Sequence, residues 1–290
     1  LAIKPDLAEA HNNLGITLKD LGKLDEAINS FDMAGTQQSR AMSLECYYFL
    51  EKYDVSYSNL DKLIALDKSN IRAAAISAFV ADQLVHNDPY PFCKNPLDFI
   101  RVSHLDASAH YTDGLIDELL DDLSHQSAVW EPIGKTTKFG FQTASNLFSN
   151  PENSLAKLDR IIKEAINAYY FEYGSMDCTF MDLWPKQLQV SGWYVRLLDR
   201  GHQTSHIHPS GWLSGVIYLK VPEASQKDEG AIEFSIHGYE YPILNNEYPR
   251  MLHQPKEGEI ILFPSSLFHK TLPISGDSER STISFDLLPT

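Results

Sequence analysis

Two kinds of hydrophobic spacing divide the sequence into an N-terminal and a C-terminal part. Up to about residue 90, apolar residues recur every three or four positions, which is the spacing of one face of a helix. From about residue 187, short runs rich in Val, Ile, Tyr and Phe alternate with turns that contain Gly, Pro and Asp, which is typical of strands. The pattern predicts an α+β protein, with helices first and a sheet or barrel after them.

The first helical stretch, residues 2–34, is predicted to form two amphipathic helices that are separated at Gly22. Small residues in both helices would let them pack closely as an antiparallel pair. The packing positions resemble those of a tetratricopeptide repeat: Leu14, Gly15, Leu18, Ala27, Phe31 and Ala34, with Pro5-Asp6 at its start. Residues 1–3 resemble the end of a preceding repeat that has been cut away.

Residues 43–66 predict two more helices and residues 71–84 a third, with a spacing that departs from the repeat. We interpret them as a degenerate or capping repeat, which would act either as a plain helical packing module or as a groove for a protein partner. Residues 87–91, NDPYP, break the helical pattern and predict a domain boundary. The expected domains are a tetratricopeptide-like helical region at residues 1–90, truncated at its N-terminus, and a second domain at residues 96–290.

The second domain is predicted to carry helices at residues 113–123 and 151–170, with a short strand at 138–143 between them. Five further strands are expected at residues 187–198, 213–221, 231–236, 259–263 and 281–287, with the first turn at residues 199–201. Short strands separated by regular turns favour a sandwich or an open barrel of the jelly-roll type.

Composition narrows the function classes. The 290 residues are 43% hydrophobic, as expected for globular domains, and the net charge of −15 argues against nucleic-acid or anionic-membrane binding. No apolar run reaches the roughly 18 residues of a membrane-spanning helix. Cys46, Cys93 and Cys178 form no disulfide framework, which fits a reducing compartment and predicts a cytoplasmic location.

Three histidines are candidate metal ligands. His206 and His208 are two residues apart, and residues i and i+2 of a strand share a face, so both are expected to aim at one point. His269, from a later strand, would complete a three-histidine site for a divalent first-row metal, with further positions open. The alternatives are that the His pair caps a barrel mouth without metal, or that His202 is a ligand instead.

Arg280 is a candidate anion-binding residue. Its planar guanidinium can hold a carboxylate with two hydrogen bonds, and Thr282, two residues on, would present its hydroxyl on the same face. The alternative is a surface ion pair of Arg280 with Glu279 or Asp277.

Four blocks carry a family resemblance over about residues 96–290: HIHPSGWLSGVIYL, GAIEF, GEIILFPSSLFHKTLP and ERSTISFDL. Together they resemble the 2-oxoglutarate- and Fe(II)-dependent oxygenases, in particular the bacterial and phage type with an HxHP…SGVYYL signature. The resemblance implies a double-stranded β-helix, cupin-like, with helices outside it. It also implies a dioxygenase that hydroxylates a peptide, protein or small-molecule substrate and releases succinate and CO2.

The resemblance implies roles for individual residues. His206 and His269 match the first and last metal ligands, Arg280 matches the arginine that holds the 2-oxoglutarate carboxylate, and Thr282 matches the hydroxyl beside it. His208 departs from the usual HxD or HxE motif: it either completes a three-histidine site with catalytic His206 and His269 or turns away. Glu233 is a further candidate for the missing carboxylate. Two other functions stay open, a non-catalytic adaptor and a metal-dependent cupin enzyme that does not use 2-oxoglutarate.

Overall fold

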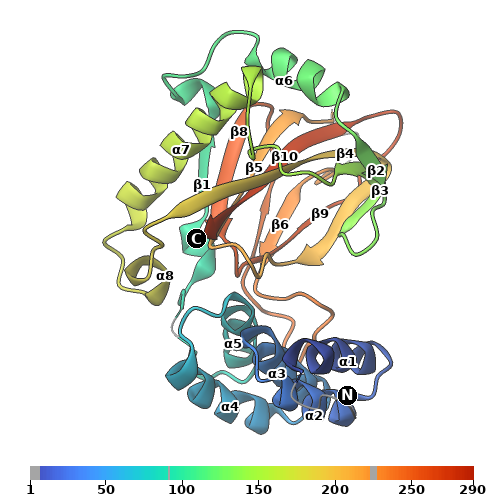
Figure 1. The fold of residues 1–290 in the computed structure, drawn as a ribbon, viewed down its shortest axis with the longest axis vertical. Helices are drawn as coiled ribbons and strands as arrows, with labels where there is room; N and C mark the ends of the chain where they lie inside the picture. The colour runs from blue at the N-terminus through green and yellow to red at the C-terminus, as the bar shows by residue number, and fades with distance from the viewer. Residues whose placement is uncertain (1–6, 91, 223–226) are drawn as a thin grey trace. The chain divides into compact units, whose positions relative to one another are not determined.

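The computed structural model describes residues 7–90, 92–222 and 227–290, which form two compact units (Figure 1). The first unit extends to Lys94 and also includes Cys178–Phe180 and Tyr239–Tyr248. The second contains Asn95–Asp177, Met181–Gly238 and Pro249–Thr290. The expectations for residues 1–6, including Pro5-Asp6, lie outside the described residues.

The first unit is helical, as predicted. Its helices are α1 (Ala8–Asp20), α2 (Leu24–Ala34), α3 (Gln37–Phe49), α4 (Tyr53–Leu66) and α5 (Ile71–Gln83). Gly22 separates α1 from α2 with a φ of 73°, a left-handed conformation that glycine adopts without strain. A Cβ atom at Gly15 would lie 2.5 Å from the ring of Phe31, so this glycine allows the close approach of α1 and α2. Leu14 is 38% exposed, and its prediction as a packing position is wrong.

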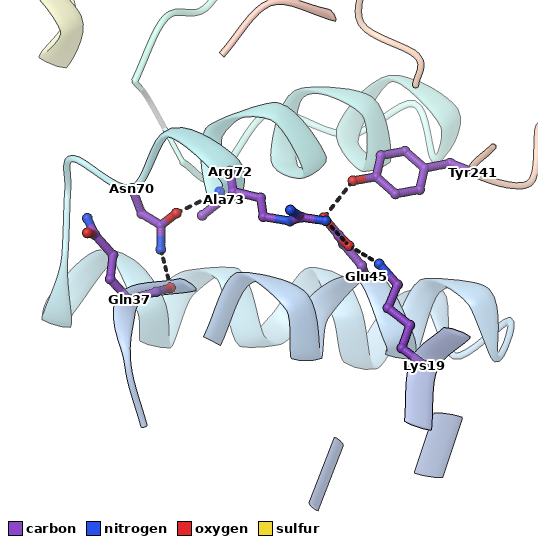
Figure 2. A network of polar contacts seen from close by, with 7 residues as sticks. All are labelled: Lys19, Gln37, Glu45, Asn70, Arg72, Ala73 and Tyr241. Atoms are coloured by element: carbon purple, nitrogen blue, oxygen red, sulfur yellow. Dashed lines mark hydrogen bonds and ion pairs between the residues drawn. The ribbon is translucent and has the colours of Figure 1, made fainter. Parts of the chain in front are cut away.

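The segment Tyr239–Tyr248, which follows β6 of the sheet, packs among these helices around the buried carboxylate of Glu45 (Figure 2). Arg72 donates Nε–H to Glu45 Oε1 at 2.6 Å, Lys19 pairs with the other carboxylate oxygen, and the Tyr241 hydroxyl donates to Oε1 at 2.9 Å. Burial alone would raise the pKa of Glu45, but the charges of Arg72 and Lys19 outweigh it and lower the pKa to about 2. Gln83 adds a second anchor, because its Oε1 accepts from the backbone N–H groups of Leu244 and Asn245. The sequence pattern did not predict that this segment joins the helical unit.

The second unit is built on a curled antiparallel sheet. Its strands are β1 (Arg101–His104), β2 (Ala128–Trp130), β3 (Thr137–Thr143), β4 (Leu188–His206), β5 (Leu213–Lys220), β6 (Ile232–Ser235), β7 (Arg250–His253), β8 (Glu259–Pro264), β9 (Phe268–Thr271) and β10 (Arg280–Pro289). Their order is β1-β8-β5-β10-β4-β9-β6-β7, with β3 also on β4 and β2 on β3. The predicted combination of helices and a sheet is therefore confirmed, and the pairings show that the sheet is antiparallel.

Helices and a hydrophobic core complete this unit. The helices are α6 (Leu115–Ser124) and α7 (Asn153–Tyr173), with the single turn α8 (Thr179–Asp182) and short 3-10 segments at Pro96–Phe99 and Leu105–Ala107. Tyr169 of α7 donates its hydroxyl proton to Phe99 O at 2.8 Å, which holds this helix beside the start of β1 (Figure 1). Side chains from β5, β6 and β8, among them Val216, Phe234 and Phe263, form a buried cluster inside the sheet.

Strand β4 corrects one prediction. The expected turn at residues 199–201 is absent, and β4 continues through it as one strand of 19 residues. Arg200 has a φ of 62°, and the pairing of β4 with β3 shifts register between Lys138 and Gly140, so the strand bends at a bulge. The bend lets the first half of β4 pair with β10 and its end pair with β9.

Three short strands, β1, β2 and β7, were not predicted, because runs of three or four residues carry little pattern. Strand β9 is the strand that was expected to carry His269. Among the described residues, no helix is both long and apolar enough to cross a membrane.

Candidate metal centre

The three candidate histidines converge at the end of β4. His206 is its last residue and is the direct partner of His269 in the register with β9. Their ring centroids lie 4.3 Å apart, and the ring of His208 lies 5.0 Å from each of them. One ligand atom from each histidine lies within 4.8 Å of the others, which is close enough for a single metal ion.

His208 reaches this position differently from what the spacing predicted. It lies beyond the end of β4, where its backbone N–H donates to Ser265 O at 3.0 Å and its carbonyl accepts from Gly211 N–H at 2.9 Å. The expectation that His206 and His208 share one strand face is therefore wrong. The ring of His208 nevertheless converges with the other two from its place just beyond the strand.

Hydrogen bonds determine which ring nitrogen of each histidine donates a proton and which is left for a metal. Nδ1 of His206 lies 2.7 Å from Thr204 O, and Nδ1 of His269 lies 3.1 Å from Leu267 O. A backbone carbonyl oxygen only accepts, so both Nδ1 atoms carry the proton and both Nε2 lone pairs are available. Nδ1 of His208 lies 2.5 Å from the Asp286 carboxylate. Each histidine thus has its Nδ1–H occupied and its Nε2 available as a ligand.

Burial keeps two of these rings neutral. His206 and His269 are 9% and 8% exposed. Burial, with the neighbouring His208, lowers the pKa of His206 to about 3, against the opposing effect of its bond to Thr204. Burial, with His206 and His208, lowers the pKa of His269 well below its usual range. A neutral imidazole is the form that binds a metal, so the site is ready for a cation at physiological pH.

Arg280 lies in the wall of the same cavity as the three histidines. The side chain is 1% exposed, and its guanidinium lies over the ring of Tyr218, 4.9 Å from the centroid. Its Nε and Nη1 atoms, Thr282 Oγ1 and Tyr218 Oη are all buried and have no hydrogen-bond partner among the described residues. The alternative interpretation, a surface ion pair of Arg280 with Glu279, is wrong. Arg280 is buried, and Glu279 pairs instead with Arg196 at 2.8 Å.

These orphaned donors fit an anionic ligand. Buried polar groups are nearly always hydrogen-bonded, and a buried guanidinium without an acceptor is costly. Burial raises the pKa of Tyr218, although nearby Arg280 opposes the shift, so the hydroxyl keeps its proton and can donate. Arg280, Thr282 and Tyr218 together offer donors to one carboxylate.

The rival residues lie elsewhere. Glu233 pairs with Lys270 at 2.9 Å and is next to Phe234, whose register partner is His269, so its carboxylate lies on the other face of β6. His202 donates Nδ1–H to Arg200 O at 2.9 Å within the bulge. The sequence reasoning missed Asp286, although it alternates with Thr282 and Ser284 along β10 and so shares their face.

Residues 191–286 match the family model described as "Putative 2OG-Fe(II) oxygenase", where 2OG is 2-oxoglutarate. This segment contains all three histidines, Arg280 and Asp286. This segment is similar to the 2OG-Fe(II) oxygenase family. The cofactors predicted from the sequence, Fe(II) and 2-oxoglutarate, are those in the family's name, and the histidine group of the oxygenase segment suits the metal.

Several solved structures are similar to this chain over most of their own length. A prolyl hydroxylase from Trichoplax adhaerens, in complex with a hypoxia inducible factor peptide fragment, has 11% identity and a TM-score of 0.47, with 74% of this chain and 89% of that chain covered. A prolyl-4-hydroxylase from Pseudomonas putida has 13% identity and a TM-score of 0.43, with 66% and 92% covered. HygX from Streptomyces hygroscopicus, with nickel and 2-oxoglutarate bound, has 12% identity and a TM-score of 0.45, with 69% and 88% covered. No curated protein sequence matches this chain.

Proposed function

We propose that this protein is a 2-oxoglutarate- and Fe(II)-dependent dioxygenase that hydroxylates a peptide, protein or small-molecule substrate and releases succinate and CO2. His206, His208 and His269 would hold the iron through Nε2. Arg280 and Thr282, with Tyr218 beside them, would hold the far carboxylate of 2-oxoglutarate. Iron and 2-oxoglutarate supply the oxidising chemistry when bound.

The proposal rests on one cavity that contains both possible metal ligands, the three histidines, and buried hydrogen-bond donors without acceptors on Arg280. One nitrogen atom of each histidine lies within 4.8 Å of the others in this cavity, and the wall contains Arg280, whose Nε and Nη1 have no partner among the described residues. Histidines alone would suit many metal proteins. A buried arginine without an acceptor narrows the choice to an anionic cosubstrate, since a carboxylate matches the guanidinium fork with two hydrogen bonds.

The chain's own residues bind, orient and shield the reactants. The Nδ1–H bonds of the histidines fix the ring orientations before any metal arrives. Val216, Ile232 and Phe263 give the cavity apolar walls, which reduce the access of water to the reacting groups.

We also propose that the helical unit is of the tetratricopeptide-like type and holds polypeptide. The packing of Gly15 against Phe31 supports this interpretation of the spacing. The unit already binds one non-helical segment of its own chain, Tyr239–Tyr248, through Glu45 and Gln83. A protein partner or a protein substrate would be recognised by further contacts of this kind.

The test is the release of succinate from 2-oxoglutarate. Protein loaded anaerobically with Fe(II) is exposed to oxygen, and succinate is measured for the wild type, His206→Ala and Arg280→Ala. We expect slow turnover by the wild type without any added substrate and none by either variant. His125→Ala, at an exposed histidine after α6, is the matched control and should leave turnover unchanged.

Two results would contradict the proposal. The first is a wild-type protein that releases no succinate and binds no 2-oxoglutarate in anaerobic calorimetry. The second is oxygen consumption that persists in Arg280→Ala without 2-oxoglutarate, which would favour a cupin enzyme with another cosubstrate.

A further inference from the structure

Asp286 contacts a candidate metal ligand directly. It lies on β10, with its register partner Ser214 on β5, and is 8% exposed. Its Oδ1 lies 2.5 Å from His208 Nδ1 and accepts from Ser214 Oγ at 2.7 Å. Ser265 Oγ lies 2.8 Å from Ser214 Oγ and extends the buried network.

The direction of the bond between His208 and Asp286 follows from its chemistry. A carboxylate only accepts, so the proton of this bond lies on Nδ1 of His208, and Nε2 is left as the ring nitrogen that could bind a metal. His206 and His269 donate instead to neutral backbone carbonyls. His208 therefore has a charged partner, whereas the other two ligands have neutral ones.

We infer that Asp286 is a positioning residue of the metal centre, which fixes the tautomer of His208 and supplies, one hydrogen bond away, the negative charge that an HxD or HxE motif places on the metal itself. The inference rests on the proposed function, because it takes His208 as a ligand. Two imidazoles and a carboxylate remove one unit of charge from a divalent ion, whereas three neutral imidazoles remove none. With Asp286 behind His208, the site again carries one negative charge.

The surroundings of Asp286 are built to hold it there. A Cβ atom at Gly211 would lie 3.2 Å from Asp286 Cγ and 2.6 Å from Ser265 Oγ, so a larger residue would disturb this network. The His208 backbone is bonded to Ser265 O and Gly211 N–H, and the side chain of Ser265 belongs to the same network. His208, the Asp286 carboxylate and the turn at Gly211 are therefore linked by one set of hydrogen bonds.

The test measures metal affinity, with Co(II) as the probe, by anaerobic titration of the metal-free full-length protein and visible absorption. In Asp286→Asn the side chain still accepts from Nδ1–H but has no charge. We expect Co(II) to bind about 10–100-fold more weakly, with a changed visible spectrum, because outer-shell partners of a metal ligand have effects of this size. Asp106→Asn is the matched control, because Asp106 is exposed and pairs with exposed His104 at 2.8 Å. This substitution should leave the Co(II) affinity and the visible spectrum unchanged.

The effect must also depend on His208. In a His208→Ala background, Asp286→Asn should weaken Co(II) binding by less than about two-fold, because the two residues act as a pair. Wild-type affinity and spectrum in Asp286→Asn would overturn the inference, and so would an equal loss in the His208→Ala background. A wild-type protein that binds no Co(II) would overturn it together with the proposed metal centre. A protein that binds Co(II) but neither binds nor consumes 2-oxoglutarate would overturn the proposed function alone, and the role of Asp286 would still be decided by the titrations.

Discussion

His206 on β4 and His269 on β9 face each other as direct partners in an antiparallel register, and each donates its Nδ1–H to the backbone carbonyl two residues earlier in the chain. Two of the three candidate ligands are therefore positioned by backbone pairing and by local hydrogen bonds. Only His208 depends on a turn and on the distant side chain of Asp286.

Replacing either strand histidine should remove the metal site. We expect His206→Ala and His269→Ala to weaken Co(II) binding by more than about 100-fold, since loss of an outer-shell partner alone costs about 10–100-fold. His202→Ala is the matched control, because His202 bonds to Arg200 O and lies outside the histidine group. If His202→Ala weakened binding as much as His206→Ala, the assignment of ligands would be wrong.

Arg280 should determine the affinity for 2-oxoglutarate. We expect Arg280→Lys to weaken binding by about 10-fold or more, because lysine keeps the charge but loses the planar fork, and one charged hydrogen bond is worth about 1.5–3 kcal/mol. Anaerobic calorimetry with Co(II)-loaded protein measures this. Co(II) affinity in the same variant should stay at the wild-type value, and a parallel loss of both would point to a folding defect instead.

The same arginine should destabilise the protein when no ligand is present. Its buried Nε and Nη1 have no acceptor, so we expect Arg280→Met to raise the melting temperature of the protein without ligand. Adding 2-oxoglutarate with Co(II) should stabilise the wild type but not the variant. A lower melting temperature for Arg280→Met without ligand would show that the guanidinium is already satisfied.

Glu45 should make the stability of the protein sensitive to acid. Its pKa in the folded protein, about 2, lies below the ordinary value of 4.5, so its contribution is present above pH 4.5 and is lost as the pH falls toward 2. At neutral pH we expect Glu45→Gln to lower the free energy of unfolding by about 3 kcal/mol, from 1.36 kcal/mol per pKa unit. Urea unfolding of the wild type and of Glu45→Gln across this pH range should give free energies of unfolding that become equal in acid. A difference between the two proteins that stays constant with pH would contradict a stabilising role for the Glu45 charge.

Tyr241 should hold the segment Tyr239–Tyr248 in the helical unit. Tyr241→Phe keeps the ring, which stacks on Phe79 at 5.5 Å, but removes the hydrogen bond to Glu45. We expect a loss of about 1.5–3 kcal/mol in the free energy of unfolding, the range for a bond to a charged group. Hydrogen exchange in this segment should become faster. Tyr170→Phe, at a half-exposed tyrosine of α7, is the control and should have no effect.

The sequence was enough to predict most of the elements and the candidate residues. Helical periodicity located the helices up to Gln83, and short runs rich in β-branched and aromatic residues between turns located β5, β6, β8 and β10. Both signals are local, because each arises within a single element of the chain. The histidines and Arg280 were selected by the chemistry of their side chains, which the sequence also contains.

The tertiary structure alone decided how these residues meet. The bulge at Arg200 turns a predicted break into one long strand, and the register of β4 with β9 makes His206 and His269 neighbours. Asp286 lies 78 residues from His208 in the chain and reaches it through the pairing of β10 with β4 and β5. Such contacts depend on long-range strand register, and no local pattern of hydrophobic and polar residues specifies which distant strands will pair.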